Sequence, residues 1–335
     1  MVRIKDVAKL ANVSTATVSR VLRNAGNVKE ETRKRVLEAI EKLHYQPNVL
    51  GRNLRRMETE TILVVVPDMT NPFFSKVLRG IESVAIQNGY RVLLGDTQNN
   101  VRLEEEYLNL LHQKQVDGTI FLTARINKEL MEEMSQQFPI VLACEYLEGA
   151  TIPTVSIDNI SSARKATEHL IKLGHRRIAH LSGPMNIILS RDRLRGYQQA
   201  MMQYELDVEP VLIQEGDFSY ESGYNLTLKL LALKNPPTAI FAANDEMAIG
   251  AIKAIRKLSL RVPDDIAVVG FDDIKIASIF EPNLTTISQP MFEIGEKAMN
   301  LLLQLMEGKK LDRRQFVLED RLIVRDSCGG KGMEK

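Results

Sequence analysis

The sequence has 335 residues, of which 44% are apolar and 26% are charged. This balance is typical of globular proteins, and the length suffices for two or three domains. The longest apolar runs, such as Ile62–Val66, are far shorter than the roughly 20 residues that cross a bilayer, and the first residues lack the apolar segment of an export signal. The two cysteines exclude a disulfide framework and a cysteine-based zinc site. Composition therefore predicts a cytoplasmic protein that does not enter a membrane.

The net charge of +1 conceals an asymmetry along the chain. Residues 1–58 contain 13 Lys and Arg but only 6 Asp and Glu, a net charge of +7, and the remaining residues carry −6. A basic segment ahead of a mildly acidic body indicates that the segment binds a polyanion and the body does not. The alternative is a basic terminus that is merely solvated, and the sequence pattern has to decide between the two.

The first predicted elements are two short helices joined by a tight turn. Apolar residues recur at helical spacing over 4–11. Asn12 tolerates the left-handed conformation of a tight turn, and Ser14 is a good cap for a second helix over 15–22. Helices joined in this way predict a helix-turn-helix. The expected buried stripe of the second helix is Val18, Val21 and Leu22.

Between its buried positions, the second helix is expected to present short side chains and one cation. Hydroxyls of this kind suit contacts to phosphates or bases, and methyl groups suit contacts to thymine. The sequence therefore predicts a recognition helix for duplex DNA. Its reading residues are expected to be Thr15, Ala16, Thr17, Ser19 and Arg20.

A third helix is predicted over 30–44, with Glu30 and Glu31 in its first turn, where acids favour the helix dipole. Pro47 ends it. Three small helices give a thin core, which suits a domain that presents side chains to a partner. The expected inner face consists of Val36, Leu37, Ile40 and Leu43.

The segment 48–56 is only partly compatible with a helix, because it contains Gly51 and a cluster of positive charges. One interpretation is a flexible linker. The other is a segment that folds only on DNA, with Leu54 wedged into a minor-groove step and its arginines on phosphates.

From Thr61 onward, apolar runs alternate with amphipathic segments of helical length such as 73–88 and 102–114. This alternation predicts parallel sheets covered by helices on both faces. About 270 residues exceed one comfortable sheet, so two consecutive α/β subdomains are expected, with a ligand cleft at their strand ends. The predicted strands are 62–66, 91–95, 118–122, 140–143, 177–181, 239–242 and 266–271.

The sequence contains a series of short motifs. Residues 1–60 contain I-K-D-V-A-K-L-A-N-V-S-T-A-T-V-S-R-V-L, followed by H-Y-Q-P-N. The others are P-F-F-S (72–75), G-H-R-R-I (174–178), R-L-R-G-Y (193–197), A-A-N-D-E-M-A-I-G (242–250), V-V-G-F-D-D (268–273) and L-T-T-I-S-Q-P (284–290). Together these motifs resemble those of LacI/GalR-type bacterial repressors. Within the family, the chain is most similar to the cytidine and purine repressor subgroup, which shares P-F-F, G-D-F-S-Y-E-S-G (216–223) and the Thr15-Ala16 pair.

The resemblance implies an N-terminal all-α helix-turn-helix headpiece and a periplasmic-binding-protein-like core of two doubly wound parallel-sheet subdomains. The chain is expected to cross between the subdomains near 159 and again near 288, with a helix at about 290–308 returning to the first. The implied boundaries are 1–47 for the headpiece, 48–60 for the hinge, 61–158 with 289–318 for the N-subdomain, 159–288 with 319–328 for the C-subdomain, and 329–335 for a tail.

The resemblance also implies a homodimer that binds a near-palindromic double-stranded operator and responds to a small-molecule effector. The tail contains no leucine heptads for a tetramerising coil, which favours a dimer. The expected DNA-binding residues are Ile4, Lys5, Ser14, Thr15, Ala16, Thr17, Ser19, Arg20, Asn27, Thr32, Tyr45, Asn48, Arg52 and Leu54.

One acidic and three aromatic candidates for the effector site follow a predicted strand or lie in a loop. Asp68, Phe73 and Phe74 follow the first strand, and Phe218 lies in the G-D-F loop. Phenylalanine rings stack on a sugar face or a heterocycle. The alternative is that these rings cap the core.

Polar candidates come chiefly from the family motifs. The resemblance assigns Arg193, in the motif R-L-x-G-[YF], as a ligand clamp; the alternative is a solvated charge. It assigns Asp272 to ligand hydroxyls; the alternative is a residue that caps a turn. Asn244 either reaches the ligand or caps a helix. Gln289 at the second crossover and Glu145 complete the set.

Two departures from the family pattern bear on the effector. Cys144 and Glu145 stand where many relatives have Asp or Asn, which leaves open which of the two faces the cleft. Ile187 and Leu189 replace polar residues that read a purine base, so a purine is not expected. A nucleoside or a sugar remains, and the sequence does not decide whether it releases or recruits the protein.

Two rival classes are a ligand-binding α/β enzyme and a non-regulatory sugar-binding protein. The sequence lacks G-x-S-x-G, G-x-G-x-x-G, G-x-x-x-x-G-K-[ST] and H-E-x-x-H, and its five histidines do not form a ligand-spaced cluster. We therefore expect no catalytic residue, no cofactor and no metal. A sugar-binding protein outside the cell would have no use for residues 1–58.

Overall fold

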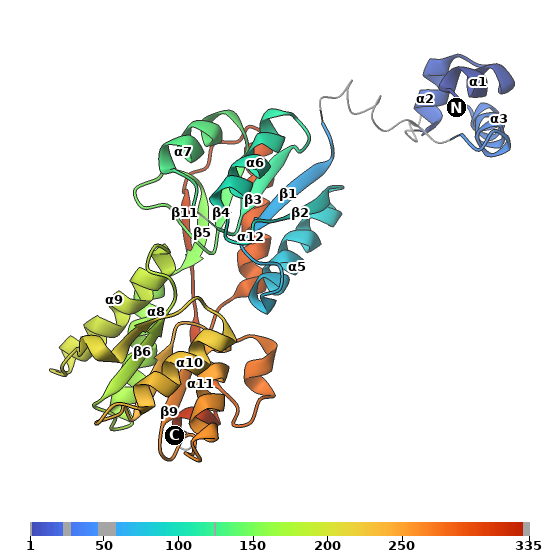
Figure 1. Cartoon of the computed structure of the whole chain (residues 1–335). Helices are drawn as coiled ribbons and strands as arrows, with labels where there is room; N and C mark the ends of the chain where they lie inside the picture. The colour runs from blue at the N-terminus through green and yellow to red at the C-terminus, as the bar shows by residue number, and fades with distance from the viewer. Residues whose placement is uncertain (1, 23–27, 46–57, 124, 331–335) are drawn as a thin grey trace. The chain divides into compact units, whose positions relative to one another are not determined.

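The computed structural model describes residues 2–22, 28–45, 58–123 and 125–330. The chain forms two compact units, which we call the head (1–58) and the core (59–335). Each is described here by itself (Figure 1).

The head contains α1 (Ile4–Leu10), α2 (Thr15–Leu22) and α3 (Glu30–Lys42). Its small core joins apolar residues of all three helices, among them Val7, Val18 and Val36, each fully buried. Asn12 has φ of 51° in the turn between α1 and α2, as the sequence predicts. The Ser14 Oγ accepts the Thr17 backbone N–H at 3.1 Å and so caps α2. These contacts confirm the predicted helix-turn-helix.

Two predictions about the inner faces of the head are wrong. Leu22 is 36% exposed and Leu37 is 51% exposed. Three short helices enclose only a narrow core, which Val21 and Val36 already fill, so these leucines lie outside it.

The core contains two six-stranded sheets, which we call the first and second sheets. The first has the order β11-β5-β4-β3-β1-β2, and every recorded pair in it is parallel. Its strands β1, β3, β4 and β5 are buried along their whole length, whereas β2 is an exposed edge strand. The strands are β1 (Thr61–Val66), β2 (Arg91–Asp96), β3 (Gly118–Phe121), β4 (Ile140–Ala143), β5 (Thr154–Ile157) and β11 (Gln315–Leu318).

The second sheet has the order β12-β10-β9-β8-β6-β7. Its strands are parallel except β12, which runs antiparallel to β10. The strands are β6 (Ile178–Ser182), β7 (Ile213–Glu215), β8 (Ala239–Ala242), β9 (Ala267–Asp272), β10 (Thr285–Ser288) and β12 (Arg321–Ile323).

Helices pack on both faces of each sheet, in the doubly wound arrangement that the alternating pattern predicts. The α5 and α12 helices pack against each other, as do α8 and α9, and α10 and α11. The helices are α5 (Pro72–Gln87), α6 (Val101–His112), α7 (Lys128–Gln137), α8 (Asn159–Lys172), α9 (Ile188–Gln203), α10 (Tyr220–Leu231), α11 (Asp245–Lys257) and α12 (Met291–Met306), with short 3₁₀ helices η1 (Pro210–Leu212), η2 (Lys275–Ser278) and η3 (Asp326–Cys328).

The chain crosses from one sheet to the other three times. Strands β1 to β5 belong to the first sheet and β6 to β10 to the second, after which β11 returns to the first and β12 to the second. The α12 helix contacts β3, β4 and β5 of the first sheet. These returns bring chain segments far apart in sequence into the same half of the core.

All seven predicted strands are present, and their ends differ from the expected ones by at most one residue. The pattern missed β5, β7, β10, β11 and β12. These are strands of three or four residues, and β7, β11 and β12 are only partly buried, so they lack the long apolar run that identifies a buried strand.

Candidate functional site

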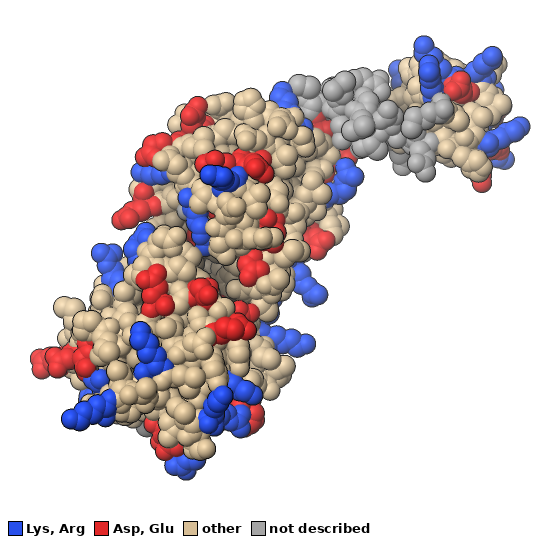
Figure 2. All heavy atoms as spheres, viewed as in Figure 1, with Lys and Arg blue, Asp and Glu red and all other residues tan. Residues whose placement is uncertain are grey.

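The carboxyl ends of strands from both sheets face one another across a cleft in the core. Tyr146 follows β4, and its hydroxyl donates to Asp192 Oδ2 on α9 at 2.7 Å. Lys76 on α5 donates to the Asp273 carbonyl after β9 at 3.4 Å. The surface is hollowed between the two halves of the core, and Asp and Glu side chains border the hollow (Figure 2). The cleft therefore lies where the sequence pattern places a ligand.

Arg193 on α9 follows Asp192, the residue that contacts Tyr146 across the cleft, and is 4% exposed. Its guanidinium donates to Asn159 Oδ1 at 2.9 Å and to the Ala243 carbonyl at 2.5 Å. It also stacks on the Phe271 ring, 3.8 Å from the ring centroid. Arg193 is thus a fixed, buried cation, which excludes the interpretation of a solvated surface charge.

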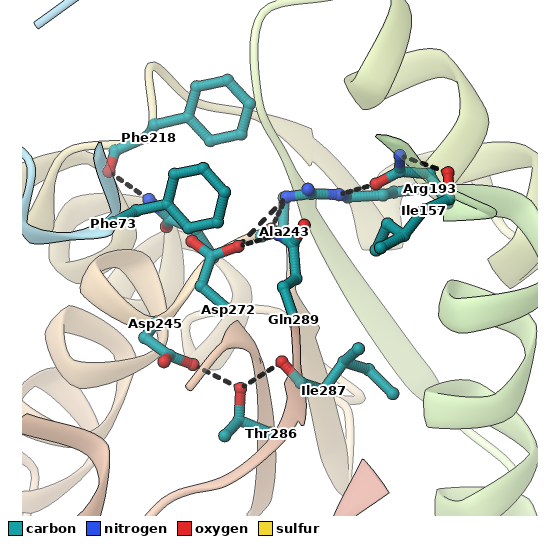
Figure 3. A network of polar contacts seen from close by, with 12 residues as sticks. Phe73, Ile157, Arg193, Phe218, Ala243, Asp245, Asp272, Thr286, Ile287 and Gln289 are labelled. Carbon is teal, nitrogen blue, oxygen red and sulfur yellow. Dashed lines mark hydrogen bonds and ion pairs between the residues drawn. The ribbon is translucent and has the colours of Figure 1, made fainter. Parts of the chain in front are cut away.

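Asp272 ends β9 and faces Arg193, with Oδ1 at 3.9 Å from the Arg193 Nη1 (Figure 3). The Gln289 amide donates to the same Asp272 oxygen at 2.7 Å. Burial raises the pKa of Asp272 to about 7, although Arg193 and Gln289 act in the opposite direction. Three predicted site residues therefore form one polar cluster of the kind that holds ligand hydroxyls.

Asp245 lies beneath this cluster and is fully buried at the first turn of α11. Its carboxylate accepts the Thr286 hydroxyl at 2.6 Å and the Ile274 backbone N–H at 2.9 Å. Burial and the neighbouring Asp272 raise the pKa of Asp245 well above its usual range. Asp245 thus anchors the ends of β9 and β10 from below (Figure 3).

Phe73 and Phe218 come from opposite halves of the core and lie on the same side of Asp272 in Figure 3. Phe73 is 6% exposed and packs edge-to-face on Phe74, which is partly buried. Phe218 has φ of 70°, and its carbonyl accepts the Asn244 amide at 2.9 Å. The other end of that amide caps α11 through the Met247 N–H at 3.0 Å. The capping interpretation of Asn244 is therefore confirmed, while its contact with a ligand stays a prediction.

The remaining predicted effector residues lie on the first-sheet side of the cleft. Asp68 accepts the Thr70 N–H and hydroxyl, at 2.8 and 2.6 Å. Burial raises the pKa of Glu246 on α11, and the charge of Asp68 raises it further. Glu145 is 5% exposed and forms an ion pair with Arg125 at 3.5 Å. Both carboxylates thus belong to the border between the two halves.

Sequence reasoning missed several residues of this cleft. Asn159 holds Arg193, Arg125 holds Glu145, and Tyr146 joins Asp192 across the cleft. Each is an isolated polar residue outside the quoted motifs. Arg125 and Tyr146 come a few residues after the predicted strands 118–122 and 140–143, and this was the available signal, because ligand residues gather at strand ends in such folds. Asn159 follows β5, which the pattern missed, so no such signal pointed to it.

In the head, α2 presents the predicted reading residues. Thr15, Ala16 and Arg20 are exposed, and Thr17 and Ser19 are partly exposed. The head carries Lys and Arg side chains on several sides (Figure 2). This surface fits duplex DNA, whose backbone is a regular array of negative charges.

The other predicted DNA-binding residues are distributed around α2. Lys5 and Ser14 are exposed, whereas Ile4, Thr32 and Tyr45 are half-buried, and Ile4 and Tyr45 pack on the small core. Their DNA contacts stay predictions. Four further predicted residues lie outside the described residues: Asn27, Asn48, Arg52 and Leu54.

Family models match both parts of the chain. The model of bacterial regulatory proteins of the lacI family matches residues 3–48, and that of the periplasmic binding protein-like domain matches residues 167–328. The chain is 42% identical over 325 residues to the HTH-type transcriptional repressor CytR of Escherichia coli strain K12. The matched region covers 97% of this chain and 95% of CytR.

Two solved structures are similar over nearly the whole chain. The Lac repressor dimer bound to operator and the anti-inducer ONPF is 31% identical, with a TM-score of 0.89 over 98% of this chain and 99% of that one. The complex of the transcriptional regulator CelR with cellobiose is 31% identical, with a TM-score of 0.74 over 98% of this chain and 100% of that one.

The fold and the helix-turn-helix head define a DNA-binding transcriptional repressor, and the relatives are regulators, not enzymes. The chain belongs to the lacI family of bacterial regulatory proteins. In the described part of the chain, no helix has the length and apolar character needed to cross a membrane.

Proposed function

We propose that the protein is a homodimeric repressor that binds a near-palindromic operator and is controlled by a nucleoside or a sugar in the cleft of the core. The observation that carries the proposal is the buried cluster of Arg193, Asp272 and Gln289, in a chain whose head presents a recognition helix. A cation and two acceptors at strand ends suit a hydroxylated ligand. A repressor has to meet its operator DNA, so the proposal includes a cytoplasmic location.

Exposed apolar side chains on the first-sheet half support the dimer. Leu93 and Leu94 on the edge strand β2 are 50% and 42% exposed, and Ile86 on α5 is 66% exposed. Such side chains on a sheet edge are typical of an interface. The similar Lac repressor structure is a dimer on its operator. A second copy of this chain on this face would present two identical heads to the two half-sites of a palindrome.

The CelR complex supports a sugar as effector, because that similar protein is solved with cellobiose. A nucleoside has a sugar for the polar cluster and a base that stacks on Phe73 or Phe218. Ligand at Arg193 and Asp272 would change how the two halves of the core close. The change reaches the operator through the segment between core and head.

A screen of the full chain against nucleosides, free bases, pentoses and hexoses by thermal shift tests the effector. We expect a nucleoside or a sugar to raise the melting temperature, because a ligand that binds only the native state stabilises it. Arg193→Ala is expected to abolish this shift and retain operator binding, while Arg195→Ala, an exposed residue of the same helix, keeps both. A normal shift in Arg193→Ala contradicts the assigned site.

Selection of operator sequences from a random duplex library by the full chain tests the DNA contacts. We expect a near-palindromic site, at least tenfold weaker binding by Arg20→Gln, and an affinity that falls steeply with salt because bound phosphates release counterions. The exposed Arg102 on α6 provides the control variant Arg102→Gln, which should bind as wild type. A flat salt dependence or an asymmetric site argues against the proposed mode.

A further inference from the structure

Arg125 is a cation on the first-sheet side of the cleft for which the proposed function has no role yet. Its side chain is 11% exposed. The guanidinium lies 4.0 Å from Glu104 Oε1 and 3.5 Å from Glu145 Oε1. Arg125 thus stands between two buried carboxylates, one from α6 and one from the segment after β4.

Glu104 fixes the position of Arg125. Its carboxylate is fully buried and accepts the Thr123 hydroxyl at 2.9 Å, the Arg125 backbone N–H at 3.2 Å and the Ile126 N–H at 3.1 Å. Burial raises the pKa of Glu104, and these donors act in the opposite direction. Because Glu104 binds the backbone of this segment as well as its side chains, Arg125 is held against the cleft border.

Glu145 interacts with two cations, one on each half of the core. Arg125 is its partner on the first-sheet half. On the other half, burial lowers the pKa of Arg193, and the carboxylates of Asp272 and then Glu145 oppose this effect most strongly. The chain neighbours of these two residues are in direct contact, since the Tyr146 hydroxyl donates to Asp192 Oδ2 at 2.7 Å, so the charges of Glu145 and Arg193 lie close enough to interact. In a buried setting such an attraction is strong, and without Arg125 it would draw Glu145 toward Arg193.

We infer that Arg125 is a positioning residue of the effector site, which retains the Glu145 carboxylate on the first-sheet half so that Arg193 stays paired with Asp272 and open to a hydroxylated ligand. Arg125 acts through Glu145 and does not touch the ligand. The inference rests on the proposed effector site, but it concerns the arrangement of charges and holds for a nucleoside or a sugar.

A measurement without effector tests this arrangement. In the full chain labelled with ¹⁵N-arginine, the side-chain N–H resonance of Arg193 is assigned by its loss in Arg193→Lys. We expect Arg125→Gln to move this resonance, because Glu145 then pairs with Arg193. Adding Glu145→Gln to Arg125→Gln is expected to return it close to the wild-type position. An unmoved resonance in Arg125→Gln overturns the inference.

Affinity measurements form the second test, with cytidine, uridine, adenosine and D-ribose as probes in titration calorimetry. For a probe that binds wild type, we expect Arg125→Gln to weaken binding about tenfold. On a Glu145→Gln background the same change is expected to cost less than twofold, because the charge that Arg125 restrains is already gone. Equal losses on both backgrounds overturn the inference.

The controls separate this role from a loss of folding. Arg102→Gln, on the exposed face of α6, is expected to leave the Arg193 resonance and the probe affinity unchanged, and Arg125→Lys is expected to retain most of the affinity.

If Arg125→Gln does not fold, Glu145→Gln alone decides: the Arg193 resonance should then stay near its wild-type position, and a large shift contradicts the inference. If no probe binds wild type, the proposed ligand class fails while the resonance test still decides the role of Arg125.

Discussion

Asp272 carries a carboxyl group whose pKa burial raises to about 7, whereas the value in an unfolded chain is about 3.9. Between these two values the native protein binds more protons than the unfolded chain, so the free energy of unfolding decreases as pH rises through this window. We therefore expect Asp272→Asn, which removes the charge, to raise the melting temperature at pH 8. Near pH 4, at the lower end of this window, where Asp272 is protonated in the native state and only partly ionised in the unfolded chain, the difference should largely vanish. Melting curves at both pH values check this, and an equal difference at both would show that burial of the charge is not the cause.

The residues of the polar cluster were partly predictable because Arg193 and Asp272 belong to motifs. Arg125, Tyr146 and Asn159 were not, because each acquires its role from a partner in another element: Glu145, Asp192 and Arg193 lie 20, 46 and 34 positions further along the chain. Local pattern carries no information on such pairs. Leu37 is a residue that local pattern predicted to be buried and that the structure leaves exposed. Helical periodicity identifies a face of the helix but not how much of that face the partner helices cover.

The α5 and α12 helices approach each other so closely that each needs a glycine at the crossing. A Cβ atom on Gly295 would lie 2.0 Å from the Val77 carbonyl oxygen, and one on Gly80 would lie 2.1 Å from the Phe292 carbonyl oxygen. We expect Gly295→Ala to destabilise the protein by about 1–3 kcal/mol, the usual cost of overpacking. Urea unfolding measures this. Asn300→Ala, at an exposed position of the same helix, should cost less than about 1 kcal/mol, and equal stability of the two variants would mean that the helices move apart without strain.

At the scale of elements, apolar runs were sufficient to locate seven strands. Most of them are buried on both faces and have no need of polar residues, whereas β2 is an exposed edge strand that was located by its run of apolar residues 92–94. The strands that escaped are short, and some lie at sheet edges where polar and apolar residues mix. β10 escaped although it pairs with both β9 and β12, because its residues Thr285–Ser288 contain one large apolar side chain. Its place in the sheet depends on pairing, which sequence period alone does not reveal.

For the whole molecule, length and alternation predicted two α/β halves, and motifs added the return of α12 to the first. The antiparallel β12 was not predicted. It pairs with β10 although some 30 residues separate them, so only the assembled sheet shows the partner. The same holds for the cleft, whose contacts join the two halves through residues such as Lys76 and Asp273 that no local pattern connects.

The hydrogen bond from Tyr146 to Asp192 joins the two halves of the core beside Glu145 and Arg193, so it stabilises the arrangement in which they face each other. Hydrogen bonds to charged groups contribute about 1.5–3 kcal/mol, and a loss of about 1.4 kcal/mol shifts an equilibrium tenfold. We expect Tyr146→Phe, which removes only the hydroxyl, to favour separation of the halves and to weaken effector binding by about that factor. Distances between spin labels on the two halves measure the separation, with Tyr204→Phe on the exposed end of α9 as the control. Because coupling between sites is reciprocal, the ratio of operator affinities with and without effector must equal the ratio of effector affinities with and without operator in each variant. Unchanged label distances together with unchanged effector affinity in Tyr146→Phe would show that this bond does not set the closure of the cleft.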